Sequence, residues 1–567
     1  MEKHKVIIIG GVACGPKTAA RVKRLNADMD VTIIEKGEFL SYAGCGLPYY
    51  LSSEVNDYTE LMSTPTGVIR DAIFFNKVKD VRVLNKTLAE GVDREKKIVN
   101  VRNLDSGETM GIAYDSLVLA VGASPFIPPI QGVDLKGVYS LTTVEDARNI
   151  RDMQGELSGK NVVVVGGGLI GLEAAEAFVK QGMNVTIVER LETVLAALID
   201  PEIAYHVHNE LKSKGVNLCL DESVEKIVGD NAGKVKSVMT EKGEFPADFV
   251  LMAIGSRPNA ILAKDMGLEI GDFGAIKVDA CMRTSDPNIF AGGDCVENIN
   301  IVTGKPAFTP MGSVANKHGR VIADNICGKE SQFKGVAGSA ICKILDINVS
   351  RTGLSEQDAK KEGYDYITLL SPSPDKPHFY PDAKLIIVKL VVDKKTRRLL
   401  GAQIVGPGDV AQRIQVAVSA ISNGSTVDEI GCLDLAYAPP FSPAMDNIIV
   451  CANIARNKLD GIARSLSPVE VKEKIMNNED FIFLDVRGPD EYEMMRIEDP
   501  RVKLIPLGKL RESINELEKE KEIICFCKIS LRGYEAQRIL EAEGYDNVKF
   551  MDGGIVCWPY DKFVQSA

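Results

Sequence analysis

The residue with the most reactive side chain in a conspicuous setting is Cys45, within the stretch Leu40–Tyr50. Glycines at positions 44 and 46 flank it, so the backbone can turn sharply and approach another molecule closely. Pro48 suits the first turn of a helix, which would place the sulfur near a helix N-terminus. Because a helix N-terminus stabilises an anion, this position favours a nucleophilic thiolate. A small buried cysteine in a glycine-rich turn is the alternative.

A dinucleotide-binding unit is expected directly ahead of Cys45. An apolar strand at 6–9 runs into Gly10-Gly11-Val12-Ala13-Cys14-Gly15, a helix follows to about residue 26, and a second strand at 31–34 ends in Glu35. In such a unit the glycine loop and the helix N-terminus meet a pyrophosphate, and the acid binds ribose hydroxyls. Val12 replaces the middle glycine of the strict pattern, but the distance from Gly15 to Glu35 fits it.

The same unit recurs further along the chain. A strand at 162–165 leads into Gly166-Gly167-Gly168-Leu169-Ile170-Gly171, a helix extends to residue 180, and a strand at 185–188 ends in Glu189. The glycine pattern is complete here, and two such units indicate two dinucleotides. The Glu189 carboxylate would accept the ribose hydroxyls of NADH and repel a 2′-phosphate, although the following Arg190 could soften that repulsion.

With these motifs the chain resembles the pyridine nucleotide–disulfide oxidoreductases, in which FAD occupies the first nucleotide fold and NAD(P)H the second. Residues 120–125 are similar to the family's connection between the two domains, and residues 253–259 to the return. Residues 289–295 resemble the second flavin motif, whose aspartate, here Asp294, holds the ribityl chain. A helix that begins at Gly312 would point its positive end at the flavin.

The resemblance assigns ligands to both nucleotides. The residues expected at FAD are Gly10, Gly11, Val12, Ala13, Gly15, Glu35, Lys36, Val83, Ala120, Gly122, Asp294, Ala315 and Phe441. Those expected at NAD(P)H are Gly166, Gly168, Leu169, Ile170, Gly171, Glu189, Arg190 and Gly255.

Cys45 narrows the choice within the family. Disulfide reductases of this family carry a second cysteine five residues after the first, but position 50 is a tyrosine here and the next cysteine is Cys219. Oxidised Cys45 is therefore a sulfenic acid or a mixed disulfide with an external thiol. Single-cysteine members include NADH oxidases and peroxidases, and coenzyme A disulfide and persulfide reductases.

The first helix favours the coenzyme A enzymes. Lys17, Arg21 and Arg24 share one helix face, which is either a solvated basic face or a site for the phosphates of coenzyme A. The coenzyme A disulfide reductases look most similar and bind the coenzyme along this helix. The resemblance adds further candidate ligands, so the expected coenzyme A set is Lys17, Arg21, Arg24, Ser41, Arg70 and Asn316. Gly44 departs from that subfamily, where asparagine is usual.

Residues 329–455 resemble the family's dimerisation domain, which completes the partner subunit's active site. Strands at 385–390 and 399–404 are expected to form a hairpin around residues 393–395. Tyr437 and Tyr380 match the two tyrosines that coenzyme A disulfide reductases place there. A phenol can donate a proton to a sulfur leaving group, although core packing is the alternative for either tyrosine.

The composition changes after about residue 457. A serine cap at Ser467, a proline and a glutamate at Glu470 predict the start of a helix, and strands are expected at 481–487, 505–507 and 523–527. Cys527 then opens a loop that ends at Arg532, with a helix from 533 to about 543. A strand, a loop and a helix in this order form a ring of amides that holds an anion. The segment resembles a rhodanese, in which a six-residue loop of this kind transfers sulfur. Cys525 is interpreted as a packed core thiol.

Bulk properties set limits on function. The net charge of −12 argues against a nucleic-acid binder, and the 12 cysteines lack the spacing of metal ligands. Free thiols suit a reducing compartment. The first five residues run straight into a strand, and no apolar run reaches transmembrane length. A cytoplasmic protein without a nucleic-acid or membrane partner is expected.

Together these features predict an α/β protein with two Rossmann-like domains, an α+β dimerisation domain and an α/β rhodanese domain. The expected boundaries are 1–112 and 255–328 for FAD, 113–254 for NAD(P)H, 329–455 for dimerisation, 456–466 for a linker and 467–567 for the rhodanese. The expected enzyme is an FAD-dependent NAD(P)H reductase of coenzyme A persulfide, polysulfide or coenzyme A disulfide. It would be a homodimer with shared active sites, and its catalytic residues would be Cys45, Tyr437, Tyr380, Cys527 and Arg532.

Two alternatives stay open. The first is an NADH oxidase or peroxidase that uses a Cys45 sulfenic acid, which would leave the rhodanese unexplained. The second is a redox-sensing interaction protein that signals from its NADH-bound state. Turnover with a disulfide well above oxygen consumption separates the reductase from both.

Overall fold

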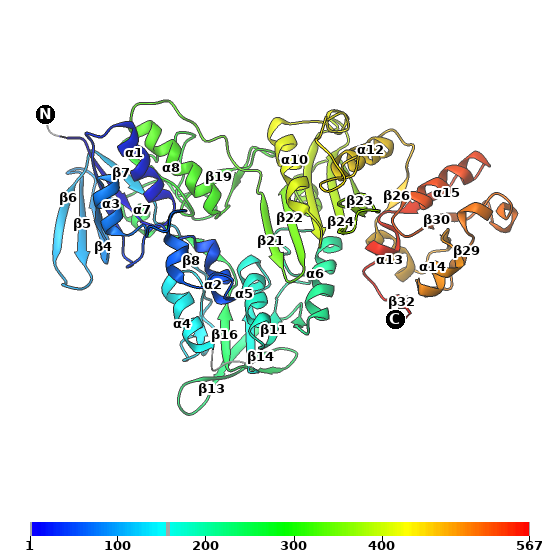
Figure 1. Cartoon of the computed structure of the whole chain (residues 1–567), viewed down its shortest axis with the longest axis horizontal. Coiled ribbons are helices and arrows are strands. Elements are labelled where there is room, and N and C mark those ends of the chain that lie inside the picture. The colour runs from blue at the N-terminus through cyan, green and yellow to red at the C-terminus, as the bar shows by residue number, and fades with distance from the viewer. Residues whose placement is uncertain (1–2, 155–158, 566–567) are drawn as a thin grey trace. The chain divides into compact units, whose positions relative to one another are not determined.

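The structure is a computed structural model that describes residues 3–154 and 159–565 (Figure 1). The chain forms two compact units, one of residues 1–192 and 214–336 and the other of residues 193–213 and 337–567. Residues 193–213 fall within the predicted NAD(P)H-binding range, yet they pack with the second unit. The mixed α/β fold class is confirmed in both units.

The first nucleotide fold is a parallel five-stranded sheet in the first unit. Its order is β18 (Ile289–Ala291), β7 (Ser116–Leu119), β1 (Lys5–Ile9), β2 (Asp30–Ile34) and β3 (Arg82–Leu84). Helix α1 (Cys14–Leu25) connects β1 to β2, and α8 (Gly312–Ile326) packs along it (Figure 1). The apolar residues of β1 and β2 are buried from both sides, as a central parallel strand requires.

The second nucleotide fold repeats this arrangement. Its sheet order is β12 (Asn217–Cys219), β11 (Asn184–Val188), β10 (Asn161–Val165), β16 (Phe249–Met252) and β9 (Val138–Tyr139), with α5 (Leu169–Lys180) between β10 and β11. The predicted connection and return contain β8 (Ala123–Pro125) and β17 (Ser256–Pro258), which pair antiparallel. Both strand–loop–helix–strand units are thus confirmed.

Three smaller groups of elements flank these sheets in the first unit. Helices α2 (Leu47–Leu51), α3 (Ala72–Lys79), α4 (Val144–Gln154) and α7 (Ile261–Asp265) surround the sheets. Strands β4 (Thr87–Asp93), β5 (Ile98–Asn103) and β6 (Thr109–Ala113) form one antiparallel sheet. Strands β13 (Val224–Gly229), β14 (Val235–Thr240) and β15 (Glu244–Pro246) form another.

The second unit begins with an antiparallel sheet. Its order is β21 (Ala340–Ile344), β22 (Ile347–Gly353), β25 (Leu399–Gly406), β24 (Leu385–Asp393) and β23 (Tyr366–Pro374). The predicted hairpin is β24–β25. Helices α6 (Pro201–Ser213), α10 (Val410–Asn423) and α12 (Asn447–Leu459) pack on this sheet. The buried Lys389 of β24 pairs with Asp200 at 3.1 Å and with Glu202 of α6 at 3.1 Å, so α6 is tied to the sheet by charge.

The last part of the chain is a parallel sheet with helices around it. Its order is β26 (Ser465–Leu466), β31 (Val548–Met551), β30 (Glu522–Phe526), β27 (Phe481–Asp485) and β29 (Val502–Leu504), and its helices are α13 (Pro468–Met476), α14 (Pro489–Met494) and α15 (Leu531–Ala542). The predicted cap is confirmed, because Ser467 and Glu470 form a capping box.

Two sequence expectations differ from the structure here. The strand predicted at 505–507 is wrong: β29 ends at Leu504 and a 3₁₀ turn begins at Leu507. Pro506 lies between them and has no N–H to donate to a neighbouring strand. The segment predicted as a linker, 456–466, contains the end of α12 and all of β26.

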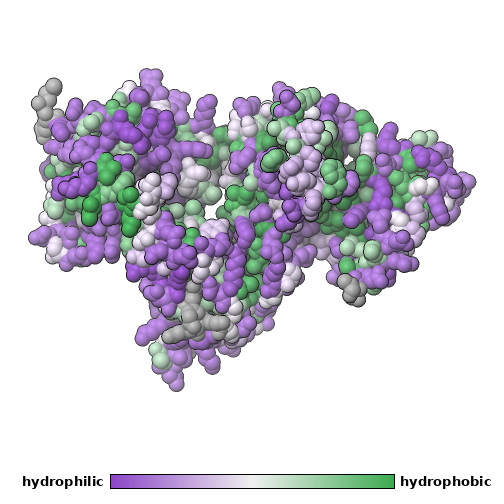
Figure 2. Space-filling view, in the orientation of Figure 1, coloured by the Kyte–Doolittle hydropathy of each residue, from purple (hydrophilic) through white to green (hydrophobic). Residues whose placement is uncertain are grey.

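Hydrophilic residues predominate on the face of the molecule in Figure 2, with smaller apolar areas between them. The described residues include no helix with the length and apolar character needed to cross a membrane. In the first unit, a large buried apolar cluster joins the strands of the first sheet to the helices α1 and α8 that pack on it.

Candidate active sites

The first glycine loop has the backbone geometry of a close-contact turn. Gly10 has a φ of +112°, and a Cβ on it would lie 2.1 Å from the Ala120 carbonyl oxygen. A Cβ on Gly15 would lie 1.9 Å from the Gly10 carbonyl oxygen. The Gly11 N–H donates to Glu35 Oε2 at 2.6 Å, which fixes the carboxylate at the mouth of the loop. Positions 10 and 15 accept only glycine, and the N-terminus of α1 that follows has no side-chain cap, so its amides form a cradle for a pyrophosphate.

The second glycine loop repeats this geometry. Gly166 has a φ of +107°, and a Cβ on Gly171 would lie 2.1 Å from the Gly166 carbonyl oxygen. The Gly167 N–H donates to Glu189 Oε2 at 2.7 Å, and the Leu191 N–H donates to Oε1 at 2.9 Å. The two nucleotide folds thus place a carboxylate at the same point relative to their glycine loops.

Asp294 provides the test for FAD in the first fold. Its pKa is raised to about 6, and burial is the cause. Within the described residues its carboxylate has no hydrogen-bond partner, whereas the neighbouring Gly293 N–H donates to His318 Nδ1 at 3.1 Å. A half-buried carboxylate that lacks a protein partner beside a dinucleotide cradle fits the hydroxyl-bearing chain of a flavin nucleotide.

Cys45 is exposed and free, so the buried alternative is wrong. It lies in a 3₁₀ turn, Gly44–Gly46, directly ahead of α2, and Pro48 occupies the first turn of that helix as predicted. Helix α2 has only five residues. A Cβ on Gly46 would lie 2.5 Å from Leu61 Cδ2, so the turn packs closely on the segment behind it. The sulfur is thus presented to solvent from a fixed turn.

Two helices of the second nucleotide fold hold the segment that follows Cys45. Helix α2 packs against α4 and α5 (Figure 1). Arg151 of α4 donates to the carbonyl oxygens of Tyr50 and Val55, both at 3.0 Å, and its guanidinium lies 4.1 Å from the centre of the Tyr50 ring. The turn with Cys45 is therefore linked to both nucleotide folds within one unit.

Glu173 is a functional candidate that sequence reasoning missed. It lies in α5, and its pKa is raised to about 7 by burial and by the charge of Glu176, while a hydrogen bond with Tyr49 of α2 opposes the shift. A carboxyl group that titrates near neutral pH thus joins α2, which follows Cys45, to the helix that follows the second glycine loop. The available signal was a glutamate two positions beyond Gly171, in an otherwise apolar helix start.

The predicted coenzyme A residues on α1 differ in exposure and in whether their charge is already paired. Arg21 pairs with Asp324 of α8, with Nη2 to Oδ1 at 2.7 Å and Nε to Oδ1 at 2.9 Å. Lys17 is half-buried and Arg24 is exposed. The three residues lie on α1 as expected, but one of the three cations is already neutralised. Their role toward coenzyme A stays a prediction.

The other predicted coenzyme A residues lie nearby in the first unit. Ser41 has a φ of +51°, and its N–H donates to the Gly11 carbonyl oxygen at 2.8 Å, which joins it to the first glycine loop. Arg70 Nε donates to the Met62 carbonyl oxygen at 3.0 Å, and the Asn316 side chain is exposed at the start of α8. Ser41 therefore holds a strained backbone conformation at the entrance of the Cys45 stretch.

The remaining predicted nucleotide ligands lie in the first compact unit, with one exception. Those of the first unit are Val12, Ala13, Lys36, Val83, Ala120, Gly122, Ala315, Gly168, Leu169, Ile170, Arg190 and Gly255. The exception is Phe441, which belongs to the second unit, and its side chain is exposed. These ligand roles stay predictions.

The two predicted catalytic tyrosines also belong to the second unit, whereas Cys45 belongs to the first. Tyr437 is 58 % exposed, and Tyr380 lies half-buried with Lys376 Nζ 5.5 Å from its ring centre. The core-packing alternative is wrong for Tyr437. Three more large apolar side chains in these two stretches are exposed, Phe379, Phe441 and Met445.

The parallel sheet at the end of the chain, predicted to be a rhodanese, carries a second cysteine site. Cys527 follows β30, and its side chain is buried at 1 % exposure. The Ile555 N–H donates to the Cys527 carbonyl oxygen at 2.9 Å, and the Gly553 N–H donates to Ser530 Oγ at 2.6 Å. Ser530 has a φ of +94°, so the loop is held in a strained curve by the segment after β31. Cys525 is fully buried in the strand, as expected.

Arg532 lies in the first turn of α15, where it is paired with a carboxylate that sequence reasoning missed. Its Nη1 and Nη2 donate to Glu491 Oε2 and Oε1 at 2.6 and 2.8 Å. Glu491 belongs to α14, 41 positions earlier, and its pKa is lowered to about 2, chiefly by Arg532. No sequence pattern links two residues so far apart, although a glutamate in a helix start was visible.

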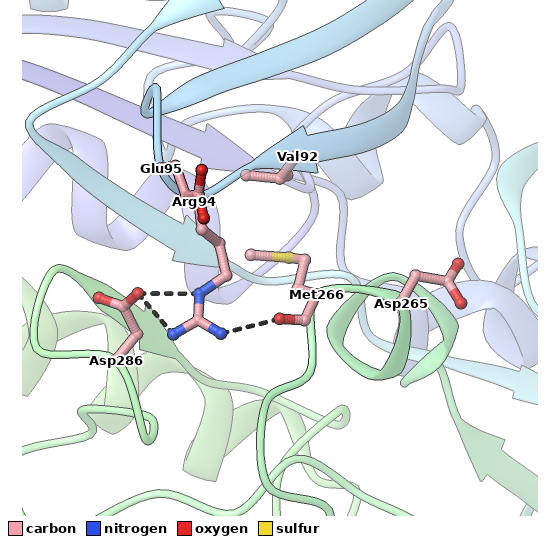
Figure 3. A pocket seen from close by; sticks show the side chains of 6 residues that line it. All are labelled: Val92, Arg94, Glu95, Asp265, Met266 and Asp286. Atoms are coloured by element: carbon pink, nitrogen blue, oxygen red, sulfur yellow. Dashed lines mark hydrogen bonds and ion pairs between the residues drawn. The ribbon is translucent and has the colours of Figure 1, made fainter.

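An open hollow of about 520 Å³ lies away from these sites, between the β4–β5 turn and α7 (Figure 3). Arg94 points into it and donates to Asp286 Oδ2 at 3.0 Å and to the Met266 carbonyl oxygen at 2.9 Å. Since these contacts already engage the guanidinium, the hollow has the features of a structural joint between strand and helix.

Three family models match the chain in order. The pyridine nucleotide-disulphide oxidoreductase model covers residues 4–313, its dimerisation domain covers 339–449, and the rhodanese-like domain covers 467–559. The chain belongs to the pyridine nucleotide-disulphide oxidoreductases. The family and its rhodanese-like extension were both expected from the sequence motifs, and FAD and NAD(P)H are the cofactors of this family.

Similar proteins of this family have been characterised or solved. The chain is 41 % identical over 456 residues to an NAD(P)H coenzyme A polysulfide/persulfide reductase from Pyrococcus horikoshii, which covers 80 % of this chain and 99 % of the relative. A solved NAD-dependent persulfide reductase from A. fulgidus is 44 % identical with a TM-score of 0.93, over 98 % of this chain and 100 % of that one. The reduced CoADR-RHD of Bacillus anthracis is 32 % identical with a TM-score of 0.92, over 98 % of both chains.

Proposed function

We propose that this protein is an FAD-dependent NAD(P)H reductase of coenzyme A persulfide, polysulfide or coenzyme A disulfide, with a rhodanese domain that handles sulfane sulfur. The observation that carries this proposal is the exposed Cys45 on a turn linked to two dinucleotide cradles, in a chain that also has a loop cysteine, Cys527, in a rhodanese fold. The printed functions of the P. horikoshii and A. fulgidus relatives support it.

At the reductase site, the glycine loops bind the nucleotides and Cys45 reacts with the sulfur substrate. The Gly10 and Gly166 loops would hold the two nucleotides, whose chemistry would supply two electrons from NAD(P)H through FAD. The Cys45 thiolate attacks the coenzyme A sulfur of the persulfide, the S–S bond breaks, and hydrosulfide leaves. Two electrons then cleave the Cys45–coenzyme A disulfide, which returns the Cys45 thiolate and releases the coenzyme A thiolate.

Tyr437 and Tyr380 would supply protons to the leaving sulfur from a partner subunit. The dimerisation-domain match and the exposed Tyr437, Phe379 and Phe441 support a homodimer in which these side chains meet a second copy. Shared active sites follow from this, because each Cys45 would face the tyrosines of the other subunit.

We also propose a cytoplasmic location. None of the 12 cysteines, all of which lie in the described residues, forms a disulfide, and reduced thiols persist in a reducing compartment.

The test is a comparison of steady-state rates with NADH against coenzyme A persulfide, polysulfide, coenzyme A disulfide and oxygen. The proposal expects turnover with at least one sulfur substrate to exceed oxygen consumption by tenfold or more. Relatives named NADH oxidase, one of them 36 % identical, make oxygen the second candidate acceptor. Oxygen consumption as fast as the best sulfur substrate would favour that candidate instead.

A further inference from the structure

The rhodanese loop has a carboxylate locked onto its arginine. Glu491 accepts hydrogen bonds from both terminal nitrogens of Arg532, at 2.6 and 2.8 Å. The same carboxylate accepts from the Gly488 N–H at 3.2 Å, which fixes Glu491 at the start of α14. A bidentate pair of this kind is among the strongest that side chains make, and its geometry is specific.

A second pair supports the position of Glu491. The buried Arg487 donates to Asp485 through Nε at 2.9 Å and Nη2 at 2.6 Å, and it donates to the backbone carbonyl oxygens of Glu491 and Met495 at 3.1 and 2.8 Å. Asp485 is the last residue of β27, so the strand end holds α14 in place. The Glu491 carboxylate is therefore preorganised toward the loop.

Arg532 connects this carboxylate to the reactive sulfur. The pKa of Arg532 is raised above its ordinary value, first by its hydrogen bond with Glu491 and further by the charge and hydrogen bond of Cys527. The Arg532 guanidinium therefore pairs with Glu491 and lies close enough to Cys527 for the charge of the sulfur to act on it. One guanidinium separates the negative charge of Glu491 from the sulfur that receives the sulfane atom.

This contact changes the charge that a sulfur donor meets. The loop amides and the N-terminus of α15 attract an anion, but the positive charge of Arg532 is compensated by Glu491. The other cation of the loop, Lys528, is exposed. Thiosulfate brings two negative charges to the loop, whereas the sulfane end of a thiol persulfide brings at most one. The Glu491 carboxylate repels the dianion more strongly.

We propose that Glu491 makes the Cys527 loop selective for thiol persulfides against thiosulfate and other dianionic sulfane donors. This rests on the proposed role of Cys527 in sulfur transfer. The Cys527 thiolate attacks the sulfane sulfur, the donor S–S bond breaks, and its electron pair leaves with the thiolate of the persulfide donor. An acceptor nucleophile such as cyanide then takes the outer sulfur from the Cys527 persulfide and restores the thiolate, so no oxidant or reductant is consumed.

The selectivity links the two cysteine sites of this chain. A loop that accepts thiol persulfides takes its sulfur from the same chemical class that the proposed Cys45 site reduces. Glu491 therefore serves as a specificity-determining residue for the rhodanese site.

The test uses the full-length flavoprotein and the variant Glu491→Gln, which keeps the size and one acceptor oxygen and removes the charge. Thiocyanate formation from cyanide is measured with thiosulfate and with glutathione persulfide, and the rate of Cys527→Ser is subtracted as background. Glu491→Gln should raise kcat/KM for thiosulfate tenfold or more and change that for glutathione persulfide less than threefold. Glu493→Gln, an exposed carboxylate of the same helix, is the matched control and should change neither.

An unchanged donor ratio in Glu491→Gln overturns the selectivity, and so does an equal loss with both donors, which would make Glu491 a purely structural support. Glu491→Asp keeps the charge and should keep the wild-type donor ratio, whatever the stability of Glu491→Gln. If the wild-type protein is no faster than Cys527→Ser with either donor, the sulfur-transfer role of Cys527 itself fails. That result differs from the one in which the enzyme is active and depends on Cys527, but its donor ratio does not change in Glu491→Gln.

Discussion

The Gly167 N–H donates a hydrogen bond of 2.7 Å to Glu189 Oε2, which holds the Glu189 carboxylate at the mouth of the second glycine loop. The Leu191 N–H holds the other oxygen at 2.9 Å. A carboxylate that accepts from two backbone donors is held in place, while the Arg190 side chain is exposed. Glu189 should therefore dominate the choice of nicotinamide.

We predict that the enzyme prefers NADH over NADPH. Changing Glu189 to alanine should raise the ratio of kcat/KM for NADPH to that for NADH by about tenfold, because a 2′-phosphate no longer meets a carboxylate and Arg190 can contact it. Initial rates with both nucleotides measure this. Arg190→Ala is the companion variant and should shift the ratio toward NADH; a wild-type preference for NADPH would show that Arg190 dominates.

The pKa of Glu173 predicts a pH effect on stability. Burial raises this pKa to about 7, above the ordinary value of 4.5, so the folded protein favours the protonated carboxyl. The stabilisation present below pH 4.5 is lost as pH rises through about 7. Glu173→Gln removes this loss, so its Tm relative to wild type should be higher at pH 8 than at pH 5, by an amount that corresponds to about 1–3 kcal/mol.

Thermal unfolding of both proteins at the two pH values checks this prediction, with Glu192→Gln, an exposed carboxylate outside α5, as the control. The same Tm difference from wild type at both pH values would mean that Glu173 titrates as an ordinary exposed acid.

Shared active sites predict complementation between inactive subunits. Mixing Cys45→Ser subunits with Tyr437→Phe subunits should give heterodimers in which one of the two sites is intact and the other carries both changes. Recovered activity should approach half of the wild-type rate per heterodimer. Co-expression with two affinity tags, followed by turnover assays on the purified heterodimer, measures it; no recovery would place both residues in one chain's site.

The two cysteine sites should be separable by substitution. Cys527→Ser should remove sulfurtransferase activity and leave reduction of coenzyme A disulfide within about twofold of wild type, because Cys527 belongs to a loop in the rhodanese fold and not to a nucleotide fold. Cys525→Ala is the control, although this fully buried thiol should cost about 1 kcal/mol of stability. Loss of disulfide reduction in Cys527→Ser, with bound FAD and unchanged Tm, would contradict this division.

Local patterns were sufficient for much of the fold. The glycine loops, the Ser467 cap and the β24–β25 hairpin each depend on residues close together in sequence, and all were predicted. The strand expected at 505–507 was wrong because an apolar run around Pro506 carries no information about which backbone groups pair.

Only those site residues that lie within sequence motifs could be predicted. Cys45 and Cys527 stand in recognisable loops, but Glu173 and Glu491 act through partners on other helices, Tyr49 and Arg532. Those pairs depend on tertiary packing, for which one sequence offers no periodicity. The neutralisation of Arg21 by Asp324, more than 300 positions away, has the same origin.

The central claim is that Cys45 carries the sulfur chemistry while the nucleotide folds work without it. The most direct measurement is made on Cys45→Ser under anaerobic conditions. The loss of flavin absorbance on addition of NADH is measured first, and turnover with coenzyme A persulfide and with coenzyme A disulfide is measured second. Flavin reduction should persist while turnover with both substrates falls at least 100-fold. Near-normal turnover in Cys45→Ser would contradict the account.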